Sequence, residues 1–141
     1  MASEQAESNE AEVARETAAA FGRAFTDGET AAFLEWLSAE IRFEAPSVMK
    51  QTALTLNGHD EVRAYVEQTA GEYDELHIET RELRDLGGGR FLMTGWWEAK
   101  PHARTRFGTP LGVVFEIRDG KVARMRAFFD EQLAIDAAGL A

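Results

Sequence analysis

Apolar residues recur with a helical period in the first half of this 141-residue chain. Their spacing at three and four residues predicts helices with one buried face each. The predicted helices cover about residues 12–26, 29–37 and 59–73. Asp27-Gly28 ends the first of them, and Asn57-Gly58 precedes the third.

Alternation replaces the helical period in two places. Ile41, Phe43 and Ala45 alternate with charged residues and predict a strand that closes at Pro46, whereas 47–56 is left open between a loop and a short strand. From Leu76 onward the alternation predicts four strands joined by turns. Their expected ranges are 76–86, 90–99, 104–118 and 121–129, with Gly87-Gly88-Gly89 as the first turn.

A last short helix is expected after Asp130, whose carboxylate can accept hydrogen bonds from the free backbone N–H groups of the first turn. Helices thus gather at the front of the chain, and an antiparallel meander gathers at the back. This order predicts an α+β fold in which a curved antiparallel sheet wraps around N-terminal helices.

The last hairpin admits two registers. A two-residue turn at Asp119-Gly120 sets Phe115 opposite Arg124 and mixes apolar and charged side chains on both faces. A three-residue loop, 118–120, pairs Phe115 with Ala123 instead and avoids burying unpaired charge. We therefore predict that loop and one continuous inner face. The residues of that face are Leu111, Val113, Phe115, Met125, Ala127 and Phe129.

The strand over 90–99 is apolar on both faces. One face carries Leu92, Thr94, Trp96 and Glu98, and the other carries Phe91, Met93, Gly95, Trp97 and Ala99. Such a strand needs cover on both sides, and the helices supply one cover. A second copy of the chain is the simplest source of the other, so we predict a homodimer through the outer sheet face, with Trp97 on that face.

The amino-acid composition limits the classes of partner and of site that the protein is expected to have. A net charge of −10 argues against binding to nucleic acid or to an anionic membrane surface. The chain has no cysteine, which excludes disulfides, thiolate catalysis and cysteine-ligated zinc. Four glutamates and no basic residue occupy 1–12, and we predict an acidic flexible tail there. No run of about 18 apolar residues follows, so we predict a cytoplasmic protein.

Several stretches taken together resemble a known family. They are "FTDGETAAFLEWLSAEIRFEAPS", "LNGHDEVRAYV" and "FEIRDGKVARMRAFFDEQLAIDAAGL". Their order resembles the SnoaL-like group of the nuclear transport factor 2-like superfamily over about 13–140. The resemblance implies a single domain over 13–141, built as a cone-shaped sheet with a deep, mostly apolar pocket at its open end, commonly in a homodimer. It implies little about the reaction, because the superfamily hosts several kinds of isomerase, cyclase and hydrolase as well as binding modules.

Most catalytic residues of the known enzymes of this superfamily are missing from the matching positions of this chain. The positions that match the catalytic tyrosine and two aspartates of ketosteroid isomerases are Phe21, Ala45 and Val113. The positions that match the Asp-Arg-Asp set of limonene-type epoxide hydrolases are Glu98, Trp96 and Ala127. Glu98 is therefore the one carboxylate retained, and both established mechanisms lack their other groups.

Glu98 has two interpretations. If the strand faces are oriented as the superfamily resemblance implies, Glu98 shares the pocket face with Thr94 and Trp96. Desolvation there would raise its pKa toward the range of a general acid or base. Alternatively it is a solvated or paired charge at the strand end, beside Lys100, Arg104 or Arg106.

The three histidines are weaker candidates. His59 lies in the first turn of a helix, and His77 alternates onto the outer face. His102 lies in a connection at the mouth of the sheet, where it can serve as part of a lid. No spacing typical of a metal site occurs, so neither metal nor cofactor is predicted.

Two function classes follow. One is an isomerase, cyclase or hydrolase that acts on a small, largely apolar molecule by acid–base chemistry at Glu98. The other is a non-catalytic ligand-binding or dimerisation module of the same fold. The predicted pocket walls are Phe21, Trp36, Phe43, Ala45, Thr94, Trp96, Val113, Phe115, Met125, Ala127 and Phe129.

Overall fold

The computed structural model describes residues 2–45 and 54–139. The helices are α1 (Ala2–Asp27), α2 (Thr30–Leu34), α3 (Gly58–Gly71) and α4 (Glu131–Ala138). The strands are β1 (Leu37–Ala45), β2 (Leu54–Asn57), β3 (Tyr73–Gly87), β4 (Arg90–Pro101), β5 (Phe107–Arg118) and β6 (Lys121–Phe128). They form one sheet in the order β2-β1-β6-β5-β4-β3, in which only β1 and β6 pair in parallel.

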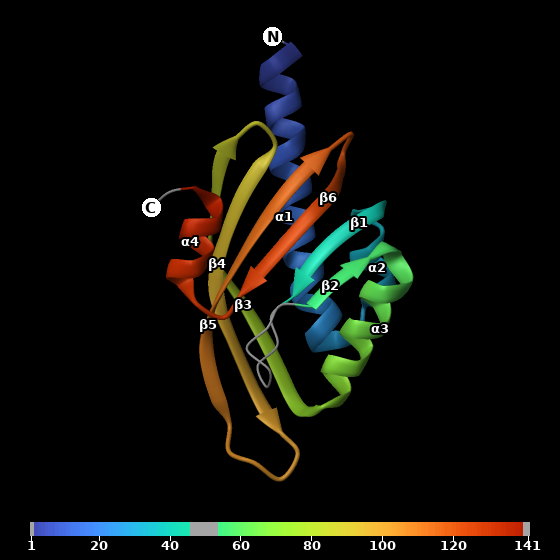
Figure 1. The fold of residues 1–141 in the computed structure, drawn as a ribbon, viewed down its shortest axis with the longest axis vertical. Helices are drawn as coiled ribbons and strands as arrows, with labels where there is room; N and C mark the ends of the chain where they lie inside the picture. The colour runs from blue at the N-terminus through green and yellow to red at the C-terminus, as the bar shows by residue number, and fades with distance from the viewer. Residues whose placement is uncertain (1, 46–53, 140–141) are drawn as a thin grey trace.

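The helices cover both faces of this curved sheet (Figure 1). The long helix α1 lies behind the sheet, and α4 lies in front of it. The main core forms between the inner face of the sheet and the first three helices, and a small second cluster forms under α4. The α+β fold predicted from the sequence is confirmed.

The start of α1 differs from the prediction. A flexible tail was expected over 1–12, but α1 begins at Ala2. Alanine, glutamate and glutamine are frequent in this segment of the sequence and have high helix propensity. Low hydrophobicity therefore did not prevent helix formation.

The region after α1 also has different boundaries. The second helix ends at Leu34 instead of residue 37, and β1 begins at Leu37. The backbone N–H of Val122 donates to the carbonyl of Trp36 at 2.9 Å, so pairing with β6 takes over where the helix was expected to continue. Within 47–56, the part from 54 onward enters β2, and 46–53 lie outside the described residues.

The hairpin of β5 and β6 closes through a two-residue turn, which corrects the predicted three-residue loop. Arg118 pairs with Lys121, and the turn residues Asp119 and Gly120 have φ of 53° and 76°, as a type I′ turn requires. The register then shifts by one residue, so that Phe115 pairs with Met125 and not with Ala123.

This register shift is a β-bulge, and it keeps the apolar side chains of the hairpin together on one face. It moves the arginines of β6 outward without a longer loop, because one extra residue on one strand changes which side chains face inward. Five of the six residues predicted for the inner face are buried, and Phe129, just beyond β6, packs against the core.

The two faces of β4 are the reverse of the prediction. Phe91 pairs with Phe115, and Met93 pairs with Val113. Residues directly opposite each other in an antiparallel pair share a face, so the odd-numbered residues of β4 point into the core. Trp97 is 3% exposed. Thr94, Trp96 and Glu98 therefore lie on the outer face.

The chain itself supplies much of the cover that was assigned to a second copy. Ala134 and Ala138 of α4 pack on Leu92 and Val114. Gly112 permits this close approach, because a Cβ atom there would lie 2.3 Å from that of Ala134. Further along the face, the Arg81 guanidinium stacks over the Trp96 ring, 5.3 Å from its centroid.

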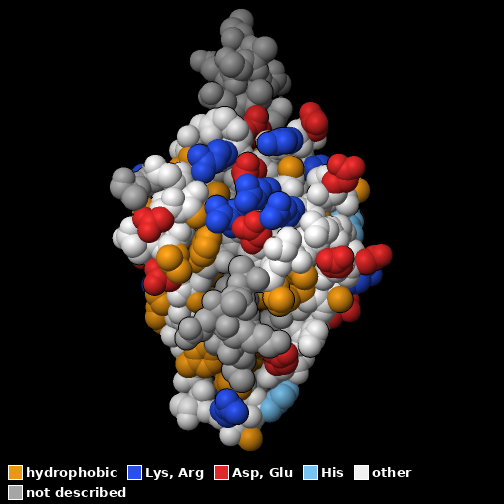
Figure 2. All heavy atoms as spheres, viewed as in Figure 1, with side chains coloured by type: hydrophobic (Ala, Val, Ile, Leu, Met, Phe, Trp, Pro, Cys, Tyr) orange, Lys and Arg blue, Asp and Glu red, His pale blue; other side chains and the backbone are white. Residues whose placement is uncertain are grey.

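Charged side chains occupy the outer face beyond α4 (Figure 2). Glu44 accepts hydrogen bonds from Arg126 at 2.7 Å and from Arg124 at 3.2 Å. Burial raises the pKa of Glu44, but these hydrogen bonds and positive charges outweigh burial and leave its pKa lowered. This part of the face is therefore an ion-paired surface, unlike the apolar part under α4.

Candidate functional site

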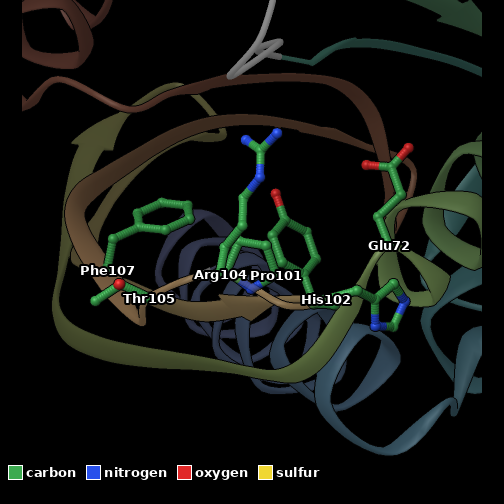
Figure 3. Close-up of a pocket in the computed structure, with 7 residues that line it drawn as sticks. Glu72, Pro101, His102, Arg104, Thr105 and Phe107 are labelled. Carbon is green, nitrogen blue, oxygen red and sulfur yellow. The ribbon is translucent and has the colours of Figure 1, made fainter.

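A pocket of about 830 Å³ opens at the end of the cone where β4 turns into β5 (Figure 3). One wall comes from the connection between β4 and β5, and the other from the end of α3 and the start of β3. We call it the mouth pocket. Its lining residues are Glu72, Tyr73, Pro101, His102, Arg104, Thr105 and Phe107.

Aromatic rings form the apolar part of the mouth pocket. Phe107 pairs with the buried Ala99, so it lies on the inner face of β5 at the end of the strand. Its ring centroid is 6.5 Å from that of Tyr73, which in turn is 6.2 Å from that of Trp97. The aromatic wall of the pocket is thus continuous with the core.

His102 joins the two walls at the rim. Its Nδ1 faces the carboxylate of Asp74, and its Nε2 lies 2.9 Å from the carbonyl oxygen of Gly71. The Gly71 carbonyl and then the Asp74 carboxylate raise the pKa of His102, because both favour the form that carries two N–H groups. Lys100 also donates to Asp74, at 3.0 Å, and hydrogen bonds from Lys100 and His102 lower the pKa of Asp74.

This arrangement gives His102 a structural task. Both ring nitrogens face acceptors, so neither is free to take a proton from a bound molecule. We therefore assign His102 to holding the connection of β4 and β5 against the end of α3. His102 lies at the mouth of the sheet, where the sequence analysis expected it.

Two charged side chains of the lining remain available to a ligand. Figure 3 shows Arg104 rising between Phe107 on one side and Glu72 on the other. Neither Arg104 nor Glu72 forms an ion pair with another described residue. Arg106, in contrast, is bound to Glu75. Burial, and secondly the charge of Glu72, raise the pKa of Tyr73, so its hydroxyl stays protonated and can donate a hydrogen bond.

The described residues pack closely in the deep interior of the cone. Between them lies a cavity of about 10 Å³, lined by Phe21, Phe25, Phe43, Tyr65, Trp97, Leu111, Ala127 and Phe129. Aromatic rings meet edge to face around it, as between Phe21 and Phe25 at 5.1 Å and between Trp97 and Phe129 at 5.1 Å. Burial raises the pKa of Tyr65 to about 12. The side chains expected to enclose a ligand pack mainly against one another.

The residues predicted for the site fall into three groups. Phe21, Phe43, Ala127 and Phe129 line the small interior cavity. The core holds Ala45, Val113, Phe115 and Met125, and Trp36 packs at its edge. The outer face carries Thr94, Trp96 and Glu98. Glu98 pairs with His77 on one side and with Gly108 on the other, away from the mouth pocket and from the interior.

Most of the mouth pocket was missed by the sequence analysis. Phe107 could have been found by extending the alternation of Leu111, Val113 and Phe115 back to the start of β5. Tyr73 was counted as the end of a helix, whereas it begins β3. Arg104 and Glu72 carry no periodic signal, because loop residues are brought together only by the fold.

Over residues 2–45 and 54–139, no three histidine or acidic side chains come together in a way that would hold a metal ion. Within the same ranges, no helix combines the length and the apolar character needed to cross a bilayer.

Comparisons with known proteins agree with this architecture. A family model for the SnoaL-like domain matches residues 18–125. No curated protein matches the chain. Among solved structures, the TerC protein co-crystallised with polyporic acid aligns with a TM-score of 0.72 and 19% identity, over 93% of this chain and 98% of that one.

Two further structures show the same fold. A putative polyketide cyclase from Xanthomonas campestris pv. campestris aligns with a TM-score of 0.70 and 16% identity, over 90% of this chain and 97% of that one. A hypothetical protein with a ketosteroid isomerase-like fold from Catenulispora acidiphila, in complex with trimethylamine, aligns with a TM-score of 0.71 and 13% identity, over 89% of this chain and 94% of that one. At these identities the likeness establishes the fold alone.

Proposed function

Because this chain belongs to the SnoaL-like domain family, a fold that hosts many unrelated functions, we propose its function from the pocket it carries. The protein binds a small, largely apolar molecule in the mouth pocket. The observation that carries this proposal is a volume of about 830 Å³ walled by Tyr73, Pro101 and Phe107. Ligand pockets commonly have such volumes and combine apolar walls with a few polar groups.

The polar groups define how such a molecule would be oriented. The Tyr73 hydroxyl can donate to the ligand, and the unpaired Arg104 guanidinium can meet an oxygen or an acidic group. The apolar part would lie against the rings of Tyr73 and Phe107. Two neighbours of the same fold were crystallised with small molecules, which supports a ligand-binding role for this chain.

We propose binding without acid–base catalysis at Glu98. Glu98 lies on the outer face, and the nitrogens of His102 are both engaged at the rim. An isomerase, cyclase or hydrolase reaction would need another proton acceptor in the mouth pocket, and among the described lining residues Glu72 carries a carboxylate. Catalysis at Glu72 is therefore the second candidate function.

Titration with 1-indanone, a compact bicyclic ketone, tests the binding proposal. We expect saturable shifts of amide NMR signals at the mouth pocket. Phe107→Ala should weaken binding by roughly fivefold or more, because fully burying a ring of this kind contributes about 1.5–3 kcal/mol and this ring is half-buried. Glu98→Gln serves as the control and should leave the affinity unchanged.

Other results would contradict the proposal. Shifts confined to the outer face, or a loss of affinity in Glu98→Gln as large as in Phe107→Ala, would relocate the site. Absence of saturable binding for 1-indanone and for related apolar molecules would remove the ligand-binding function.

The homodimer and the cytoplasmic location stay predictions. Arg124, Arg126 and Glu44 leave an ion-paired surface on the outer face, on which a second copy can pack through complementary charges. Light scattering at micromolar protein concentration decides this point, since a monomeric mass contradicts the homodimer.

A further inference from the structure

The mouth pocket carries two opposite charges that do not pair with each other. Arg104 and Glu72 both line it, and neither forms an ion pair with another described residue. Figure 3 shows the guanidinium and the carboxylate extending to the same side of the pocket, apart from each other, with the Phe107 ring beyond Arg104. A purely apolar ligand would contact the rings and leave both charges without a partner.

Hydrogen bonds fix the backbone at both charged residues. His102 ties the connection of β4 and β5 to the end of α3, and the Arg104 N–H donates to the carbonyl of Pro101 at 3.2 Å. Glu72 directly follows α3, and its N–H donates to the carbonyl of Thr69 at 3.1 Å. Each long side chain therefore extends from a fixed point, which limits the conformational entropy lost when a ligand binds.

A second pair of charges close by shows the opposite arrangement. Arg106, two residues after Arg104, is bound to Glu75, and these two residues are not among those that line the mouth pocket. On this connection, the arginine outside the lining is neutralised by the protein, and the arginine of the lining is not. A ligand can supply the missing partners, which are an acidic group for Arg104 and a cation for Glu72.

We propose that the mouth pocket binds a zwitterion with one aromatic or apolar group, such as an aromatic amino acid. The inference rests on the proposed binding function and names the ligand class more narrowly. The ligand carboxylate lies against Arg104, its ammonium lies against Glu72, and its apolar group lies against Tyr73 and Phe107. The protein's net charge of −10 disfavours a ligand that is negative overall, whereas a zwitterion has no net charge and still meets both side chains.

Probes that share one benzene ring separate the two charges. L-phenylalanine carries both, 3-phenylpropanoate lacks the ammonium, and 2-phenylethylamine lacks the carboxylate. Their dissociation constants should be measured by NMR titration at neutral pH for the wild type, for Arg104→Gln and for Glu72→Gln. Arg106→Gln and Glu75→Gln are the matched controls, because each removes the same charge from a nearby position outside the pocket lining.

We expect the wild type to bind L-phenylalanine roughly fivefold more tightly than either probe with a single charge, since partly exposed ion pairs contribute modestly. Arg104→Gln should lower the affinity for L-phenylalanine to that for 2-phenylethylamine. Glu72→Gln should lower it to that for 3-phenylpropanoate, and the two control variants should keep the wild-type preference. Arg104 and Glu72 are both exposed, so their variants should fold, and thermal denaturation checks this.

The outcomes separate this inference from the proposed function. If 1-indanone binds at the mouth pocket but one probe with a single charge binds as tightly as L-phenylalanine, the zwitterion is wrong and the binding function stands. A loss in Arg106→Gln as large as in Arg104→Gln would trace the preference to the overall field of the protein and would also overturn the inference. Saturable binding of neither 1-indanone nor L-phenylalanine contradicts both proposals.

Discussion

Phe115 and Phe107 lie on the same inner face of β5, at opposite ends of the strand, and have different surroundings. Phe115 is fully buried among core side chains, whereas Phe107 is half-buried and lines the mouth pocket. Strand, face and residue type are the same, so the difference comes only from what packs against each ring. The comparison separates a region that stabilises the fold from one that is open to a ligand.

The two regions also differ in charge. Around Phe115 the core is apolar, while the rim beyond Phe107 holds His102, Asp74 and Lys100 in one hydrogen-bonded group. Polar groups cost free energy in a packed interior but can stay hydrated at a rim. A pocket with a few polar groups therefore forms where the cone opens.

Truncating each of the two rings tests the difference between the core and the mouth pocket. Phe115→Ala should lower the free energy of unfolding by about 3–5 kcal/mol, because a cavity is left in a closed core. Phe107→Ala should cost much less, about 1 kcal/mol or below, since part of its ring already faces solvent. Chemical denaturation of both variants gives the two values, and equal losses would mean that the mouth is as tightly packed as the core.

A substitution halfway along β5 tests the packing of α4 on the opposite, outer face of the same strand. Gly112→Ala should destabilise the protein by about 1–3 kcal/mol, because overpacking against Ala134 forces α4 away from the sheet. Ala134→Gly in the same chain should recover part of this loss. If the double variant is as unstable as the sum of the single variants, the two residues do not share a contact and the position of α4 needs revision.

The smallest change in stability is expected for a substitution of His102 at the rim of the mouth pocket. A histidine whose pKa is raised on folding stabilises the folded state at pH values below its ordinary 6.5, and this contribution disappears as pH rises through its folded-state value. His102→Gln should therefore lower Tm most near about pH 6, where Asp74 is ionised and His102 is protonated, and least near about pH 9.

His77→Gln is the control for the rim, because His77 is exposed on β3 and forms no hydrogen bond or ion pair with another described residue. Its Tm should follow the wild type across the same pH range. A pH dependence shared by both variants would show that the effect does not come from the contacts of His102 with Gly71 and Asp74.

Much of the fold could be predicted because period and turn chemistry are local properties. The alternation over β5 and β6 identified the buried face, and Asp130 caps α4 through a hydrogen bond from the Leu133 N–H at 3.0 Å, as expected. The register of that hairpin was wrong, since a bulge and a longer loop both bring Phe115 and Met125 to the same face. Alternation alone does not distinguish them.

The candidate site was harder to predict, and β4 shows why. Both faces of this strand are apolar, so alternation does not say which one points inward, and a change of one residue in the loop to β5 exchanges them. The family resemblance placed Glu98 and Trp96 inside, whereas pairing of Met93 with Val113 places Trp97 there. A catalytic role for Glu98 followed from that phase, and the packing removes its physical basis.

Hydrophobic period and turn residues were enough to predict the fold class and most of the core, because both act over a few positions, and the family followed from the resemblance of longer stretches. The folded structure established which face of β4 is buried, that α4 covers part of the outer face, and that the mouth pocket lies where β4 turns into β5. Those features depend on contacts between residues far apart in the chain. Glu72 and Arg104 became neighbours of one pocket only when α3, β3 and the connection of β4 and β5 had packed together.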